Sequence, residues 1–178
     1  MGLIFVAGVH GVGKTACCLK SSAETSVPHY SASEIIKREK ISAIQGASKM
    51  VQDVPANQEL LIQGIEKLNH QGCSRFLLDG HLTIINAKRE IEKIPVEVFA
   101  RLNLEAIVVY YDDPLQICSR LKERDGIEFQ VDDVSLHQAA ELAYAQVVAL
   151  DLKIPLHPLQ AFDSLSLSHL IQTIWLAE

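Results

Sequence analysis

The chain has 178 residues, of which 48% are hydrophobic and 6% aromatic, and its formal net charge at pH 7 is −6. This length and composition suffice for one buried core, so residues 1–178 are expected to form a single domain. The negative charge gives no general attraction to nucleic acids or anionic membranes. No stretch approaches the roughly 20 apolar residues of a membrane helix, and residues 3–6 are too short for a signal peptide, which predicts a cytoplasmic location.

Short apolar runs alternate with helical patterns along the chain. Strands are predicted at residues 3–7, 27–30, 76–78, 106–111 and 154–159. Helices are predicted at residues 14–22, 34–39, 57–71, 95–102, 114–124, 134–150 and 164–176. Residues 40–55 are expected to form a loose connection, and the charged stretch 84–94 favours neither class. Five strands separated by helices predict an α/β protein, with a parallel sheet between two layers of helices.

The first predicted strand leads into the sequence G-V-H-G-V-G-K-T at residues 8–15, which matches the phosphate-binding pattern G-x-x-x-x-G-K-[ST] in its required context. The glycines let successive backbone N–H groups face inward around phosphate oxygens, at the N-terminus of the next helix. Lys14 can reach the β- and γ-phosphates, and the Thr15 hydroxyl can ligate Mg²⁺. We therefore predict a MgATP site formed by Gly8, His10, Gly11, Val12, Gly13, Lys14, Thr15 and Ala16.

A second strand also ends on a carboxylate. Residues 75–79 read R-F-L-L-D, so Asp79 is expected at the carboxyl edge of a parallel sheet, facing the phosphate loop. There it can hold Mg²⁺ together with Thr15, or orient an acceptor group. The alternative is a turn aspartate before Gly80. Asp112 and Asp113 follow the next strand, but the proline after them favours a helix cap.

Two arginines on the helix at 114–124 are candidate catalytic residues. Arg120 and Arg124 are four residues apart and so share one helix face, where they can close on the charge that develops in phosphoryl transfer. The alternative is a solvated helix end with favourably placed cations. The four cysteines have no C-x-x-C spacing, which indicates reduced thiols rather than a zinc site or disulfides.

With these motifs placed, the chain resembles the P-loop nucleoside monophosphate kinases, and among them archaeal-type adenylate kinase. The resemblance rests on F-L-L-D-G at 76–80, S-A-S-E-I-I-K-R at 31–38, the phosphate loop at 8–15, D-G-H at 79–81, I-P-V at 94–96 and R-x-x-x-R-D at 120–125. It implies the three-layer P-loop NTPase fold, with a five-stranded parallel sheet in the order 2-3-1-4-5. It also implies a monophosphate-binding insertion over residues 31–72 and a short lid near residues 120–132.

The resemblance further implies transfer of the γ-phosphate of MgATP to AMP or a related nucleoside monophosphate. The acceptor-binding residues it points to are Ser33, Lys37, Arg38, Asp79 and His81. The alternative for His81 is a loop histidine that bonds backbone groups. The sequence departs from the family after Gly80, where His81, Leu82 and Thr83 replace the usual proline and acceptor-binding arginine. Kinases of another small metabolite and ATP-hydrolysing regulatory modules that act through a protein partner stay open as alternatives, and so does a homo-oligomer.

Overall fold

The computed structural model describes residues 2–45 and 54–176. Its main sheet has five parallel strands in the order β2-β3-β1-β6-β7. Numbered along the chain within this sheet, the order is 2-3-1-4-5, so the expected α/β P-loop topology is confirmed. The strands are β1 (Gly2–Ala7), β2 (His29–Ser31), β3 (Arg75–Asp79), β6 (Leu104–Tyr111) and β7 (Leu156–Gln160).

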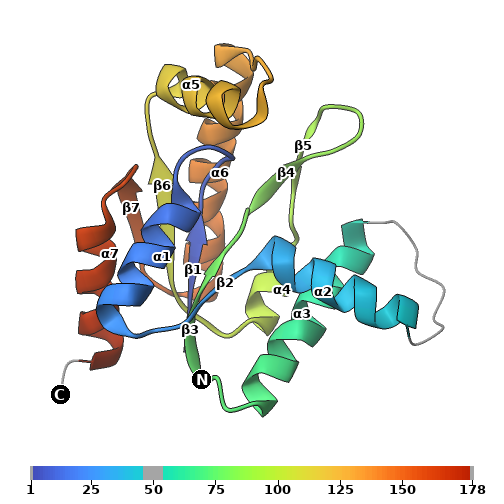
Figure 1. Ribbon diagram of the computed structural model, residues 1–178, viewed down its shortest axis with the longest axis vertical. Helices are drawn as coiled ribbons and strands as arrows, with labels where there is room; N and C mark the ends of the chain where they lie inside the picture. The colour runs from blue at the N-terminus through green and yellow to red at the C-terminus, as the bar shows by residue number, and fades with distance from the viewer. Residues whose placement is uncertain (1, 46–53, 177–178) are drawn as a thin grey trace.

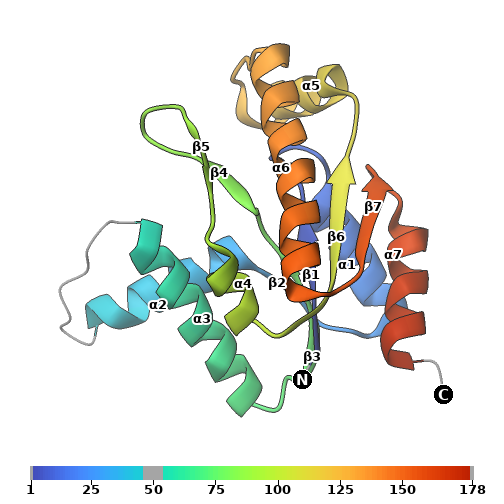
Figure 2. The same cartoon turned by 180° about the vertical axis from the view of Figure 1, so that it is seen from behind.

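Helices cover both faces of this sheet (Figures 1 and 2). One face carries α1 (Lys14–Thr25) and α7 (Ser164–Ile171), and α7 continues as a π-helical turn (Gln172–Leu176). The other face carries α6 (Val131–Leu152), α4 (Val96–Arg101) and α3 (Val54–His70). Helix α2 (Ala32–Gln45) packs against α3, and α5 (Pro114–Asp125) lies beyond the carboxyl edge of the sheet.

The buried central strand β1 divides the core in two. Successive side chains of a strand point to opposite faces. Leu3 and Phe5 accordingly pack in a cluster with α2, α3, α4 and α6, whereas Ile4 and Val6 pack in a second cluster with α1, α5 and α7. A strand that is apolar at every position is therefore required here, as expected for a parallel sheet covered on both faces.

Two stretches differ from the sequence expectation. Helix α2 runs through Gln45 instead of ending at residue 39, and Ser42 on this extension borders a small cavity between α2 and α3. Of the expected loose connection, residues 46–53 lie outside the described part of the chain. The undecided segment forms an antiparallel hairpin of β4 (Thr83–Ile85) and β5 (Ile91–Lys93), which projects from the carboxyl edge on the side of α2 and α3 (Figures 1 and 2).

The four cysteines are free thiols; Cys17 and Cys18 are buried, whereas Cys73 and Cys118 are partly exposed. Asp113 fulfils its expected role: its carboxylate caps α5 by accepting a hydrogen bond from the Leu115 N–H at 2.9 Å, ahead of Pro114. Within residues 2–45 and 54–176, no helix is both long and apolar enough to cross a membrane.

Candidate active site

The loop between β1 and α1 has the backbone that a phosphate cradle requires. Gly8 and Gly13 have φ angles of +137° and +102°, which side-chain-bearing residues rarely adopt. A Cβ atom on Gly8 would also lie 2.7 Å from the Tyr110 carbonyl oxygen. The loop then enters α1 directly at Lys14, so the helix N-terminus and its unpaired N–H groups face the cradle. The residue pattern at 8–15 therefore forms the predicted loop, hereafter the P-loop.

Lys14 is folded back onto this loop. Its Nζ donates hydrogen bonds to the carbonyl oxygens of Gly8 at 2.7 Å and Val9 at 3.0 Å, and the side chain is buried. Burial lowers the pKa of Lys14 to about 8, although the nearby carboxylates of Asp79 and Glu141 favour its charged form. A phosphate group in the cradle would give this ammonium group a stronger partner than the two carbonyls.

The lowered pKa of Lys14 predicts a pH-dependent nucleotide affinity. Lys14 carries its charge below about pH 8 and loses it above. Binding of ATP at higher pH then requires uptake of a proton, so affinity should fall by up to about tenfold per pH unit. Calorimetry between about pH 7 and 9.5 measures this fall. The Lys14→Arg variant stays charged throughout this range, so its affinity for ATP should not fall with pH. A constant affinity of the wild-type chain over this range would contradict the prediction.

One continuous cavity of about 520 Å³ connects the P-loop with helices α2 and α3. The half next to the P-loop, named the donor half after the predicted ATP site, is formed by His10, Gly11, Gly13, Lys14, Thr15, Ala16, Arg120, Arg124 and Phe162. The half next to α2 and α3, named the acceptor half after the predicted acceptor site, is formed by Ser31, Ala32, Ser33, Ile36, Asn57, Gln58, Leu61, Ile84, Ile94, Val98 and Phe99. Asp79, Gly80 and His81 lie in the wall between them. Gly8 and Val12 do not line the cavity and act through the shape of the loop.

Asp79 ends β3 beside Thr15, as the sequence predicts. Its Oδ2 lies 2.7 Å from the Nε2 of His29 on β2, and its carboxylate also accepts a hydrogen bond from the Thr15 side chain. Burial by itself raises the pKa of Asp79, but the interactions with His29, the hydrogen bond from Thr15 and the charge of Lys14 together lower the pKa below its usual value. An ionised carboxylate next to a hydroxyl is a hard oxygen donor set, which fits Mg²⁺.

A thiol completes the surroundings of this carboxylate. The Sγ of Cys18, a ring nitrogen of His29 and a carboxylate oxygen of Asp79 all lie within 4.8 Å of one another. Because burial raises the pKa of the Cys18 thiol, Cys18 keeps its proton at neutral pH. The oxygen atoms of Asp79 and Thr15 are therefore the ligands that suit a magnesium ion here.

Asp79→Asn should weaken binding of MgATP far more than binding of ATP without metal. The amide keeps the size of the carboxylate and removes its charge, so the loss should be about ten- to a hundredfold in the presence of Mg²⁺. Calorimetry with and without Mg²⁺ tests this. Asp113→Asn is the matched control, because asparagine also caps helices. An equal loss in both conditions would identify Asp79 as a structural turn residue.

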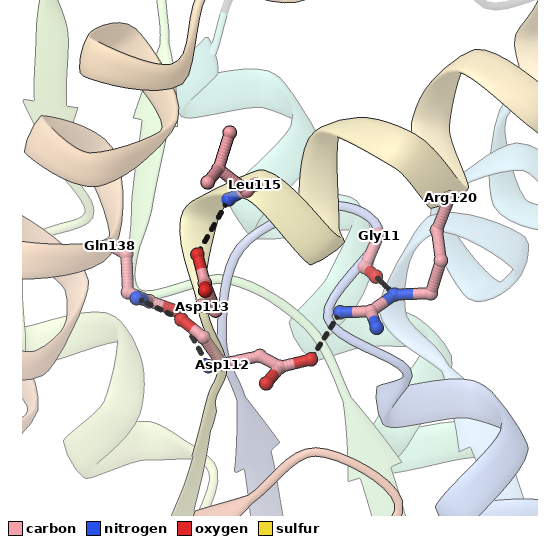
Figure 3. Close-up of polar contacts among 6 residues, drawn as sticks. All are labelled: Gly11, Asp112, Asp113, Leu115, Arg120 and Gln138. Atoms are coloured by element: carbon pink, nitrogen blue, oxygen red, sulfur yellow. Dashed lines mark hydrogen bonds and ion pairs between the residues drawn. The ribbon is translucent and has the colours of Figure 1, made fainter.

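Arg120 reaches from α5 to the P-loop (Figure 3). Its Nε donates to the carbonyl oxygen of Gly11 at 2.8 Å, and its Nη2 donates to the Asp112 carboxylate at 2.6 Å. Its guanidinium group also lies over the ring of Phe162, 5.1 Å from the ring centre. Arg120 is therefore fixed at the donor half of the cavity rather than projecting from a solvated helix end.

Arg124 is placed differently. It lines the cavity, but its side chain is 59% exposed, against 26% for Arg120. Its guanidinium group pairs with both carboxylate oxygens of the adjacent Asp125, each at 2.7 Å. The two predicted catalytic arginines thus lie on the same side of the cavity, and only Arg120 contacts the P-loop backbone.

Two histidines meet between the P-loop and the β3 edge. The rings of His10 and His81 lie 4.1 Å apart, and the Nδ1 of His81 is buried without a hydrogen-bond partner among the described residues. Burial, followed by the charge of Lys14, lowers the pKa of both rings, that of His10 to about 4. Both are therefore neutral at physiological pH, and His81 presents a neutral polar ring to the cavity.

The remaining predicted acceptor residues divide into two groups. Ser33 lines the cavity, as expected. Lys37 and Arg38 are exposed on α2 outside the cavity, and Arg38 instead borders a smaller cavity beside Glu39 and Lys67. The position of α2 that faces the main cavity is Ile36. Asn57 and Gln58, at the start of α3, are acceptor-half residues that the sequence reasoning did not single out.

Comparison with known proteins places this site in a family. The model of an AAA domain family matches residues 7–137, a range that contains the P-loop, Asp79, Arg120 and Arg124. The chain belongs to this family. No curated protein shows a significant match in sequence.

Solved structures share the fold over nearly the whole chain. A sugar kinase from Janibacter sp. HTCC2649, in unliganded form, matches with a TM-score of 0.55 and 17% identity over 99% of this chain and 94% of its own. An uncharacterized protein from Eubacterium ventriosum matches with a TM-score of 0.50 and 12% identity, and both chains are fully covered. A gluconokinase from Sinorhizobium meliloti 1021 matches with a TM-score of 0.49 and 13% identity over 98% of this chain and 96% of its own. The fold is thus that of P-loop kinases, and the likeness to archaeal adenylate kinase stays a prediction.

Proposed function

We propose that this chain is an ATP-dependent phosphotransferase that transfers the γ-phosphate of MgATP to a small acceptor. The observation that carries the proposal is the single cavity that runs from Lys14 and Thr15 to α2 and α3. Its volume of about 520 Å³ lies within the usual range for small-molecule sites. Two substrates bound in its two halves would face each other across Asp79.

The P-loop, Asp79 and Arg120 have separate roles in this reaction. The P-loop N–H groups and Lys14 bind the phosphates, and Thr15 and Asp79 would hold Mg²⁺, which supplies charge neutralisation when bound. Arg120 stabilises the charge that develops on the γ-phosphate as the acceptor oxygen attacks and ADP leaves. Such a transfer requires positioning and charge neutralisation rather than a covalent enzyme intermediate.

The acceptor that the sequence suggests is AMP or a related nucleoside monophosphate. The acceptor half supports a nucleoside-like body, because Ile36, Leu61 and Phe99 offer apolar surface to a flat ring. The amides of Asn57 and Gln58 can read the polar edge of that ring, since each amide both donates and accepts hydrogen bonds.

A second candidate is a small metabolite that reacts through a hydroxyl group. Lys37 and Arg38 are the cations that the sequence suggested for binding the phosphate of a monophosphate acceptor, but both are exposed outside the cavity. Their positions therefore favour an acceptor without a phosphate group. Asp79 would then orient the attacking hydroxyl, a role in which an ionised carboxylate is effective. The sugar kinase that shares this fold is in accord with such an acceptor.

An acceptor panel tests the proposal and separates the two candidates. Purified protein with MgATP is assayed for ADP formation with matched pairs of nucleosides and their 5′-monophosphates, and with sugars and polyols. We expect one of these classes to raise the rate well above the acceptor-free rate, and Lys14→Ala to abolish that increase. If no acceptor raises the rate, the proposed transferase activity is wrong.

A further inference from the structure

A fully buried carboxylate lies behind the P-loop. Glu141, on α6, has no exposed surface. Its Oε1 accepts hydrogen bonds from the backbone N–H groups of Gly8 at 3.2 Å and Leu82 at 2.8 Å. Its Oε2 accepts from the backbone N–H of Thr83 at 2.7 Å and from the Thr83 hydroxyl. Four donors converge on two oxygens, an arrangement that suits an ionised carboxylate because that group only accepts.

These hydrogen bonds join two segments that are far apart in the sequence. Gly8 is the first residue of the P-loop, whereas Leu82 and Thr83 follow Gly80 and His81 of the cavity wall. A buried charge is costly, and an apolar side chain of similar size would pack in a helix core without that cost. What offsets this cost is that one carboxylate accepts hydrogen bonds from both segments. It thereby links the P-loop to the segment that follows the cavity wall.

The same helix also holds the middle of the P-loop, at Gly11. Gln138 lies three residues before Glu141 and therefore on the same helix face. Its amide binds the backbone of Asp112 on both sides, accepting from the N–H at 3.0 Å and donating to the carbonyl at 2.8 Å. Asp112 in turn holds Arg120, which donates to Gly11 (Figure 3). One face of α6 thus fixes Gly8 directly, and it fixes Gly11 through Asp112 and Arg120.

We propose that Glu141 is a positioning residue that couples the P-loop to the loop at residues 80–83, so that nucleotide bound at the P-loop sets the arrangement of the acceptor half. The inference rests on the proposed function, because it takes the nucleotide as the ligand of the P-loop. Glu141 itself contacts neither substrate; it acts through Gly8 on one side and through Leu82 and Thr83 on the other.

The four threonines of the chain allow a direct test with protein labelled with ¹⁵N only at threonine. Thr15 lines the cavity and reports nucleotide directly. Thr83 is fully buried outside the cavity lining and reports through Glu141, while Thr25 and Thr173 serve as internal references. When a non-hydrolysable ATP analogue is added with Mg²⁺, the amide signals of Thr15 and Thr83 should both shift with the same dissociation constant.

Two variants remove the coupling in different ways. Glu141→Gln keeps the size and loses the charge, and Glu141→Asp keeps the charge but is too short to span both segments. In either folded variant, the Thr15 signal should still shift and the Thr83 signal should no longer respond. Ser168→Ala is the matched control, because it removes one hydrogen bond of a buried side chain, to the exposed Glu24 on the far face, and should respond as the wild type does.

The outcomes separate the inference from the function on which it rests. A Thr83 response of wild-type size in either Glu141 variant overturns the coupling role, and so does a wild-type chain in which Thr15 shifts and Thr83 does not. The wild-type measurement decides this even if neither variant folds. A wild-type chain in which Thr15 itself does not shift overturns the nucleotide site, and the coupling with it.

Discussion

Lys14→Ala is expected to lower the rate of phosphoryl transfer by about a hundred- to a thousandfold, because one preorganised cationic donor typically contributes that much. The fold should survive the change. Within the described residues, the hydrogen bonds of the ammonium group go to the carbonyl oxygens of Gly8 and Val9, which belong to the same loop. The measurement is the steady-state rate of ADP formation with the best acceptor, together with the thermal midpoint of unfolding.

The control for this change is Lys20→Ala. Lys20 lies on the same helix and is exposed, so its removal should leave rate and stability within a few tenths of a kcal/mol of wild type. If Lys14→Ala retained a rate within a few-fold of wild type, the P-loop would not be the phosphate site of this reaction.

Arg120→Ala is expected to reduce kcat by about a thousandfold, in the range of arginines that act on transferring phosphoryl groups. KM for ATP should change much less, because the guanidinium group acts mainly on charge that develops in the transition state. Arg120→Lys should rescue poorly, since an ammonium group cannot contact Gly11 and Asp112 at once as the planar guanidinium does.

Arg124→Ala provides an internal comparison and should have a smaller effect, because Arg124 is more exposed and pairs with Asp125. Arg101→Ala is the charge-matched control, because Arg101 forms an exposed ion pair with Glu59 and neither residue lines the cavity. If kcat and KM of Arg120→Ala were close to those of the wild type, Arg120 would have a structural role at the P-loop.

The parts of the molecule that the sequence predicted are those set by local patterns. The apolar run before Gly8, the glycine spacing and the lysine that opens a helix require only neighbouring residues, and the structure reproduces them. The placement of Asp79 beside Thr15 was predictable too, because parallel strands bring their carboxyl ends to one edge. The alternation of strands and helices led to a parallel sheet between helices, and the correct strand order came from the resemblance to the P-loop nucleoside monophosphate kinases.

The orientation of side chains on a helix and the contacts between distant segments were not predictable from local patterns. Lys37 and Arg38 matched a family segment, but which side of α2 faces the cavity depends on its packing against α3. The hairpin after Gly80 was missed because its strands have three residues each and Ile85, Glu92 and Lys93 are exposed, so no clear alternation marks them.

Glu141 shows most clearly which contacts the sequence could not predict. Its partner Gly8 is 133 residues away, and no local pattern reports such a contact. The available signal was a lone glutamate in the alanine-rich run A-A-E-L-A-Y-A at 139–145, on a helix whose neighbouring turns are buried. A charged residue at an interior helix position is a reason to search for donors once the fold is known.

The central claim is that the γ-phosphate moves to an acceptor rather than to water, which separates a kinase from a nucleotide-hydrolysing regulatory module. The most direct measurement uses ATP labelled with ³²P at the γ position, in the presence of the best acceptor from the panel. The account predicts that the label appears on the acceptor in proportion to the ADP formed, and that Lys14→Ala and Arg120→Ala lose this product. Label found only as inorganic phosphate, at a rate independent of every acceptor, would contradict it.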